Sequence, residues 1–541
     1  MPKREDYSGL GQSWRRDALA GITVGIVALP LALAFGVSSG VGAAAGLVTA
    51  IIAGLVAAVF GGSNVQVSGP TGAMVVVLAP IVLSHGAGVV GVLCLLAGAI
   101  VVLAGVFRLG RAVAFIPWPV IEGFTLGIAA IIFMQQVPAT VAAPAASRSS
   151  NALVAAWESV VAVVSSPEAH LATLWSVGAV VVTAGIIIVW DRFIKSVPGS
   201  FVAIVVVTLI ATLISAPLAR IGALPASLPA PAFPTFDVSV LPGLLGPAAA
   251  IAMLAAVESL LSARVAAEMA PTGAYDPDRE LFGQGLASIA SGFFGGMPAT
   301  GAIARTAVNV RSGARTRAAS IVHALVLLLV VYLASTVVAQ ISLAALAAVL
   351  MVTAVRMIPR RAIRSIMHST RGDAAILIAT AVITVAFDLI DAVLIGIVAT
   401  AFFSLRALVR TSGVHREPIP GLPVPGDERI AVIRLEGALF FGAVDSVLAR
   451  VAQIAGVEVV ILRMSALAFL DASGAHVLVE IVQGLERRGM TVLIKGIKPE
   501  HLDLMRNVGV LDSLRHEKHL FVDLDSAVEH ARSHVARAAL T

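Results

Sequence analysis

Long apolar stretches separated by short polar loops fill the chain from Ala18 to Leu408. When windows of about 20 apolar residues are taken as membrane-spanning helices, the pattern predicts fourteen segments, seven from Ala18 to Ile214 and seven from Gly246 to Leu408. The third segment (Pro70–Leu83) and the tenth (Gly301–Val310) are too short to cross about 30 Å of hydrocarbon as helices. The pattern therefore predicts two half-helices, one at the same place in each half.

The pattern changes after Leu408. Residues 410–427 are basic and rich in proline and glycine, and short apolar runs after them alternate with helical patterns. This alternation is typical of a small α/β domain. Strands are expected at Ile430–Leu435, Val457–Arg463, Thr491–Ile494 and His519–Val522, and helices at Val444–Ile454, Ala475–Arg488, His501–Val508 and Leu524–Ala538.

These patterns predict a domain plan in four parts. A cytoplasmic N-terminus (1–17) precedes a transmembrane domain (18–409), whose two repeats run over about 18–214 and 246–408. A linker (410–427) then leads to the α/β domain (428–541).

Composition agrees with a polytopic membrane protein. Hydrophobic residues make up 58% of the chain and charged residues 13%, and the mean hydropathy is +0.96, whereas soluble domains are roughly 45–50% apolar and about 25% charged. The high pI, near 9.8, would suggest nucleic acid in a soluble protein, but here the basic residues fall in membrane loops. The single cysteine, Cys94, lies in an apolar run, which excludes disulfides and cysteine metal sites. No metal or other cofactor is expected.

The charges of the loops indicate how the chain is oriented across the membrane. With the N-terminus inside, nearly all Lys and Arg residues of the membrane part fall in inner loops, and the outer loops hold only Arg148 and Arg220. This bias places both termini and the α/β domain in the cytoplasm. Because each half has an odd number of segments, the halves insert in opposite senses, which is the inverted-repeat plan of many secondary transporters.

The tenth segment carries the strongest candidate chemistry. Gly295–Arg305 (GGMPATGAIAR) opens a short helix after a proline turn, and Gly69–Ala73 (GPTGA) repeats part of this text before the third segment. Free backbone N–H groups and the helix dipole make such a start favourable for anions. Half-helices in corresponding positions indicate a binding site near the middle of the membrane.

Several motifs occur in a family-specific order: Ala20–Gly25 with Pro30, Gly69–Thr71, Glu258–Leu260, Gly295–Arg305 and Asn309–Gly313, then Phe440–Gly442 and Phe469–Gly474. On these motifs the membrane part resembles the sulfate permease (SulP) family of anion transporters, which includes the prestin-type carriers. The tail resembles the STAS domain. The resemblance implies a core and a gate domain with an elevator-like motion, and a homodimer to which the STAS domains contribute.

The resemblance also implies a substrate pocket between the third and tenth segments, walled by the first. Carried over by position, its residues are Phe35, Thr71, Gly72, Ala302, Ile303, Ala304 and Arg305. Leu31 follows Pro30 where many family members have a glutamine. One polar contact to substrate is therefore missing, and the anion is not defined by the sequence.

Two charges inside the membrane part, Glu258 and Arg305, bear on the mechanism. A charge at the bilayer centre costs about 2.5–3.5 kcal/mol on insertion scales, so such groups pair or face a cavity. One interpretation is a fixed ion pair that joins two helices. The favoured interpretation is that Arg305 attracts the anion and that Glu258 is the proton-coupling carboxylate.

The resemblance also bears on the coupling ion. Sodium-coupled relatives carry an aspartate and two threonines where this chain has Glu258, Ser262 and Ile303. Ser262 remains a candidate ion contact, but isoleucine offers no side-chain oxygen. A proton, or anion exchange without a coupled cation, is therefore favoured over sodium.

The predicted function is secondary active transport, at the plasma membrane, of sulfate, bicarbonate, a related inorganic anion or a dicarboxylate, with no enzymatic activity. Two alternatives stay open. One is a nucleobase–proton symporter of the same seven-plus-seven plan, although Arg305 would have no evident role with an uncharged ring. The other is an anion-binding sensor or channel-like protein that signals through its STAS domain.

Overall fold

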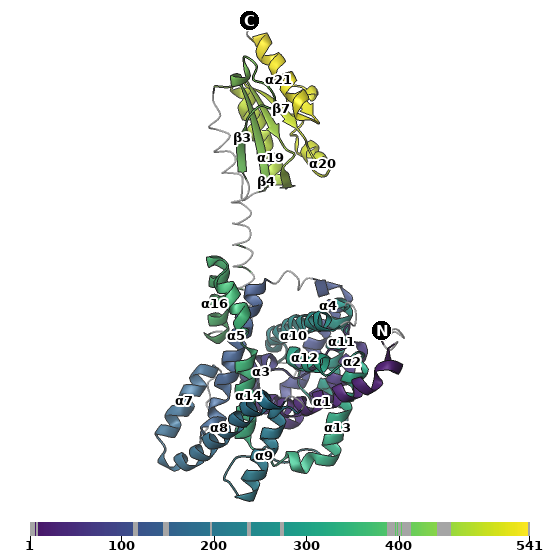
Figure 1. The fold of residues 1–541 in the computed structure, drawn as a ribbon, viewed down its shortest axis with the longest axis vertical. Helices are drawn as coiled ribbons and strands as arrows, with labels where there is room; N and C mark the ends of the chain where they lie inside the picture. The colour runs from purple at the N-terminus through teal and green to yellow at the C-terminus, as the bar shows by residue number, and fades with distance from the viewer. Residues whose placement is uncertain are drawn as a thin grey trace. The chain divides into compact units, whose positions relative to one another are not determined.

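The computed structural model describes residues 6, 9–111, 117–143, 151–194, 197–234, 240–270, 275–386, 395, 398, 402, 413–440 and 456–538. The chain forms two compact units, Met1–Ile397 and Val398–Thr541 (Figure 1).

The first unit is almost entirely α-helical. Within its described residues, eight helical stretches are long and apolar enough to cross a membrane. They contain α1 (Leu10–Ser38), α2 (Ala43–Phe60), α4 (Val90–Val106), α5 (Trp118–Gln135), α8 (His170–Phe193), α10 (Leu241–Met269), α13 (Ala318–Val338) and α14 (Leu343–Met357). Shorter helices complete the unit: α3 (Gly72–His85), α6 (Val137–Thr140), α7 (Ala152–Val164), α9 (Gly199–Leu213), α11 (Pro277–Phe293), α12 (Ile303–Arg311), α15 (Arg360–Met367) and α16 (Arg371–Ala386).

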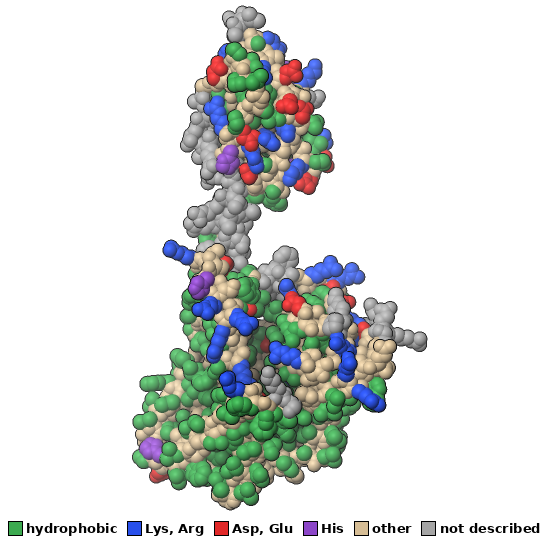
Figure 2. All heavy atoms as spheres, in the orientation of Figure 1, with side chains coloured by type: hydrophobic (Ala, Val, Ile, Leu, Met, Phe, Trp, Pro, Cys, Tyr) green, Lys and Arg blue, Asp and Glu red, His purple; other side chains and the backbone are tan. Residues whose placement is uncertain are grey.

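These helices pack in two groups. In the first group, α1 packs on α2, α12 and α13, while α11 and α10 pack on α4. In the second, α14 contacts α5, α8 and α9, and α16 contacts α5. The groups meet mainly where α3 touches α5 and where α1 touches α14 and α9. Hydrophobic side chains cover most of the lower surface of the unit, and Lys and Arg gather toward its other end (Figure 2).

The two short segments meet at the centre of the first group. Strand β1 (Ser68–Gly69), just before α3, pairs antiparallel with β2 (Thr300–Gly301), just before α12. Ser68 lies opposite Gly301, and Gly69 lies opposite Thr300. An antiparallel pairing between the two halves agrees with an inverted repeat.

The helix starts differ from the sequence expectation. Thr71 is the N-cap residue of α3, whereas α12 begins at Ile303, after N-cap Ala302. The shared Thr-Gly-Ala text therefore opens the helix in the first half but forms β2 in the second, because Thr300 and Gly301 pair with β1.

Three helices, α6, α7 and α15, were not anticipated. The pattern predicted no element at α7, because it has only 13 residues and carries Glu158 and Ser159 near its middle. The fourteenth predicted segment, Ala392–Leu408, lies outside the described residues except for isolated positions.

The second unit is an α/β domain. Its sheet has the order β3-β4-β5-β7-β8, with β6 paired to β4. The strands are β3 (Gly413–Glu417), β4 (Ile430–Leu439), β5 (Val459–Arg463), β6 (Leu467–Leu470), β7 (Thr491–Lys495) and β8 (Leu520–Phe521), and the helices are α19 (Ala472–Arg487), α20 (Pro499–Val508) and α21 (Leu524–Ala538). β3 is antiparallel to β4, and the other pairings are parallel.

Two apolar cores lie on the two faces of this sheet. Leu478 and Ile481 of α19 and Met505 of α20 pack on one face, while Ala527 and Val528 of α21 pack on the other. β3 occupies part of the stretch expected to be a linker, since a polar edge strand lacks the apolar alternation of a buried one. The helix predicted at Val444–Ile454 lies outside the described residues.

Candidate functional site

Glu258 of α10 lies where the two half-helices begin. Its Oε2 accepts a hydrogen bond from the Thr71 hydroxyl at 2.8 Å and another from the Thr300 hydroxyl at 2.6 Å. The two hydroxyl oxygens are themselves 3.4 Å apart. One carboxylate oxygen thus connects α10 to the segments that precede α3 and α12.

Arg305 lies on the buried face of α12 and is 2% exposed. Its Nη2 donates a hydrogen bond to the Pro70 carbonyl, while its Nη1 has no hydrogen-bond partner. Glu258 and Arg305, both described residues, form no ion pair. The arrangement therefore differs from the fixed ion pair that was one interpretation of the sequence.

The side chain of Arg305 can lie close to β1 because residue 69 is a glycine. Gly69 has φ +154°, and a Cβ built there would lie 2.8 Å from Arg305 Nη1. A side chain at this position would push the guanidinium away from β1. The glycine before Pro70 therefore leaves room for the arginine of the other half.

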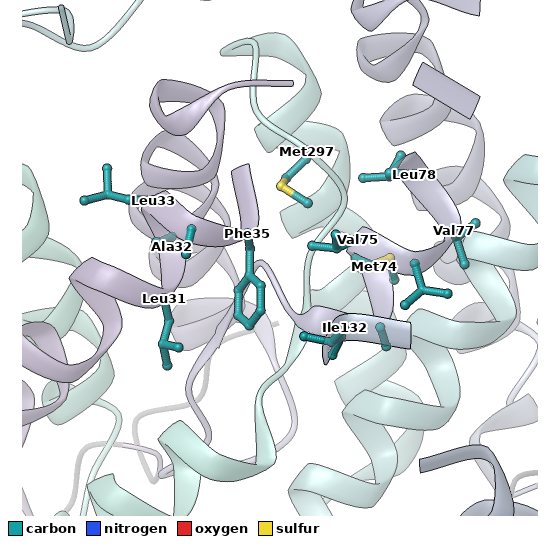
Figure 3. Packing of buried hydrophobic residues seen from close by; sticks show 14 of the residues in the cluster. Leu31, Ala32, Leu33, Phe35, Met74, Val75, Val77, Leu78, Ile132 and Met297 are labelled. Carbon is teal, nitrogen blue, oxygen red and sulfur yellow. The ribbon is translucent and has the colours of Figure 1, made fainter. Parts of the chain in front are cut away.

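The start of α3 is closed by apolar side chains. Thr71 and Phe35 are buried. A Cβ built on Gly72 would lie 2.2 Å from Ile132 Cδ1 and 3.4 Å from Phe35 Cε1. Figure 3 shows Phe35 of α1 and Ile132 of α5 within the same buried cluster. The predicted wall residue therefore does lie beside the first turn of α3.

The start of α12 is more open. Ala302 is 7% exposed, but Ile303 is 40% exposed and Ala304 is exposed too. Ile303 and Ala304 thus lie on the opposite face of the helix from Arg305, whose neighbours on the buried face are Thr306 and Asn309. The predicted residues of α12 therefore divide between two faces of one short helix.

Ser262 does not reach Glu258 through a direct hydrogen bond. Its Oγ lies 3.1 Å from the Thr306 hydroxyl, which also accepts a hydrogen bond from the Val67 amide. Ser259, one residue after Glu258, accepts a hydrogen bond from the Gly301 amide at 3.0 Å. These serines hold α10 against β2 and α12.

Two polar residues near this site, Thr300 and Gln66, were missed by sequence reasoning. In the sequence Thr300 stands out only as part of a repeated motif, although it makes the shorter of the two hydroxyl hydrogen bonds to Glu258. Buried Gln66 fills the space beside Gly301, where a Cβ would lie 1.8 Å from its Nε2. His323 is fully buried and neither ring nitrogen has a hydrogen-bond partner. Gln66 lies in a polar loop between two predicted segments, so nothing in its sequence surroundings distinguished it.

The fold and the site define a helical membrane transport protein that carries a C-terminal α/β domain. The chain belongs to the Sulfate permease family, whose sequence profile matches residues 14–380. The STAS domain profile matches residues 422–527.

Curated relatives match over nearly the whole chain. "Putative sulfate transporter YvdB" of Bacillus subtilis (strain 168) is 33% identical over 94% of this chain and 96% of its own length. The bicarbonate transporter BicA of Synechocystis sp. (strain ATCC 27184 / PCC 6803 / Kazusa) is 30% identical over 89% of this chain and 88% of its own.

Solved structures agree with the fold. The transmembrane domain of a cyanobacterium bicarbonate transporter BicA matches over 71% of this chain and 98% of its own length. The TM-score is 0.64 and the sequence identity is 33%. The overall structure of SLC26A9 covers 97% of this chain and 91% of its own, with a TM-score of 0.84 at 16% identity. The predicted fold class, a seven-plus-seven helical membrane domain followed by a STAS domain, is confirmed.

Proposed function

We propose that this protein is a secondary active transporter of a small anion that works by elevator-type alternating access. The observation that carries the proposal is the contact of Glu258 with Thr71 and Thr300, because it joins a titratable group to the start of both half-helices. The names of the relatives point to sulfate or bicarbonate as first candidates. Backbone N–H donors bind any compact anion, so a dicarboxylate is a further candidate.

We infer that the anion binds at the starts of α3 and α12. Thr71 and Gly72 contribute from α3, Phe35 contributes an apolar wall, and Ala302, Ile303 and Ala304 contribute the open end of α12. Arg305 supplies positive potential from behind the β1–β2 pair without contacting the anion directly. The few contacts between the two helix groups support movement of one group past the other.

Proton coupling at Glu258 is the second part of the proposal. Protonation would remove the negative charge that opposes an incoming anion and would weaken the hold of the two hydroxyls on the carboxylate. Three oxygens meet here, which sodium also favours, but Ser262 is turned toward Thr306 and Ile303 offers no oxygen ligand. A proton therefore fits this site better than sodium.

Transport by the purified chain in proteoliposomes tests both parts. Labelled sulfate, bicarbonate, chloride and fumarate are offered in turn under an inward proton gradient, an inward sodium gradient or no gradient, with the other anions as competitors. We expect uphill uptake under the proton gradient only. The variant Glu258→Gln should lose uphill uptake yet retain counterflow exchange, because it remains permanently uncharged.

Glu268→Gln is the matched control, since Glu268 lies on the same helix with its side chain 64% exposed. It should behave as the wild type. Absence of flux with every anion would overturn the transporter proposal. Uphill uptake by Glu258→Gln with unchanged pH dependence would overturn the coupling role alone.

We also propose that both termini and the STAS domain lie in the cytoplasm and that the protein is a homodimer. The charge bias of the loops supports this orientation. The chain has one cysteine, buried Cys94, so single introduced cysteines can be labelled cleanly. A membrane-impermeant maleimide should label Ser227→Cys on intact cells and Ser526→Cys only after lysis. Light scattering in detergent measures the oligomeric state.

A further inference from the structure

Three histidines meet at the edge of the STAS sheet, far in sequence from the transport site. His530 and His534 lie one turn apart on α21, and His519 comes immediately before β8. One ring nitrogen from each lies within 4.8 Å of those of the other two. The Nε2 atoms of His530 and His534 are 3.2 Å apart.

This spacing fits a metal ion. Zinc binds histidine nitrogen at about 2.0–2.1 Å, and two ligands at tetrahedral angles are then about 3.3 Å apart. Histidines separated by four positions on a helix face the same side. The distance between His530 and His534 is therefore that of two ligands on one ion, and a ring nitrogen of His519 lies within 4.8 Å of both.

His519 has the features of a prepared ligand. It is 2% exposed, and its Nδ1 has no hydrogen-bond partner. Its ring centroid lies 5.7 Å from that of His530 and 5.6 Å from that of His534, so the buried ring stands beside both helix histidines.

We propose that His519, His530 and His534 bind a divalent transition-metal ion, with zinc as the expected occupant. Three imidazoles suit zinc, copper or nickel and do not suit magnesium or calcium, which prefer oxygen. Water or the exposed His516, whose ring centroid is 5.8 Å from that of His519, would complete the coordination. Nearby Arg515 is already paired with Glu486, which reduces its repulsion of a cation.

The bound ion would stabilise the edge of the sheet. β8 has only two residues and pairs with β7, and Val522 after it is 90% exposed. A metal bound by His519 and α21 would fix this short strand to the helix that covers the sheet. The role is structural and independent of anion transport.

Metal binding by the full chain in detergent tests the proposal. The protein is purified on a tag that needs no immobilised metal, stripped with a chelator and titrated with zinc. Mass spectrometry of the bound metal should give about one equivalent per chain. Cobalt in its place should give the visible absorption of a tetrahedral site.

The double variant His530→Gln/His534→Gln should weaken zinc binding by about tenfold or more, since even loss of an outer-shell partner costs that much. Both residues are half-buried, so the variant is expected to fold, which elution as a sharp peak verifies. His476→Gln is the matched control, because its side chain is 68% exposed on α19. Equal zinc binding by the double variant, or none by the wild type, would overturn the proposal.

Discussion

Arg305 donates a hydrogen bond to the main-chain carbonyl of Pro70, across a sequence separation of 235 residues. The contact joins α12 of the second half to the residue before the N-cap of α3 in the first. The arginine therefore supplies positive potential and also links the two half-helices through this hydrogen bond. This double role makes its replacement informative.

We expect Arg305→Ala to reduce anion uptake by at least about tenfold, because a charged hydrogen bond worth about 1.5–3 kcal/mol is lost together with the positive charge. Arg305→Lys keeps the charge but not the planar guanidinium, so partial activity is expected. Initial rates in proteoliposomes measure both effects. Arg264→Gln, at a site 66% exposed, should leave uptake unchanged. Wild-type uptake by Arg305→Ala would contradict the assignment.

The Thr300 hydroxyl gives a second prediction. Thr300→Val keeps the shape of the side chain but removes the 2.6 Å hydrogen bond to Glu258, whereas Thr300→Ser keeps the hydroxyl. Because hydrogen bonds to charged groups contribute about 1.5–3 kcal/mol, we expect proton-driven uptake to fall roughly tenfold in the valine variant and little in the serine variant. Equal loss in both would indicate a packing role instead.

Much of this architecture is predictable from the sequence, because lipid imposes long apolar helices and the loop charges orient them. The two half-helices were predictable from their length and their proline turns. The partners of Glu258 and Arg305 were not, since Thr71 lies 187 residues from Glu258 and Pro70 lies 235 from Arg305. Side chains so far apart in the chain meet only because of how the helices pack, and this packing cannot be read from a single sequence.

In the small α/β unit, too, some elements were predictable from the sequence and others were not. Its buried strands β5 and β7 were predicted from apolar runs, but β6, with two exposed residues among four, was not. His530 and His534 stand at helical spacing and could have been noted from the sequence. His519 could not have been grouped with them, because only the β7–β8 pairing brings it beside α21.

Gly72 and Ile132 give a prediction about the boundary between the two helix groups. A Cβ on Gly72 of α3 would lie 2.2 Å from Ile132 Cδ1 of α5. We expect Gly72→Ala to destabilise the protein by about 1–3 kcal/mol, as overpacking does, and to slow transport.

Ile132→Val removes the clashing Cδ1 atom and is the matched partner variant. Alone it should cost about 0.5–1.5 kcal/mol, but combined with Gly72→Ala it should restore part of the lost stability. Thermal unfolding followed by tryptophan fluorescence reports on this unit, because Trp14, Trp118, Trp157, Trp175 and Trp190 all lie in it. Additive losses in the double variant would show that Ile132 does not limit the space at Gly72.

Glu417 on β3 gives a pH-dependent prediction. Burial acts to raise its pKa, but hydrogen bonds from Arg463 and Arg434 outweigh burial and hold the pKa below the ordinary value of 4.5. The unfolded chain therefore binds this proton more readily, so the stabilisation is complete above pH 4.5 and is lost as the pH falls through the folded pKa.

At pH 7, Glu417→Gln should lower the free energy of unfolding by about 1 kcal/mol, as loss of a partly exposed ion pair does, and the difference from wild type should shrink toward pH 3. Hydrogen–deuterium exchange of β4 and β5 peptides in the full chain, corrected for intrinsic rates, measures it. Glu500→Gln, 66% exposed, is the control, and a difference that stays constant with pH would contradict the role of the carboxylate charge.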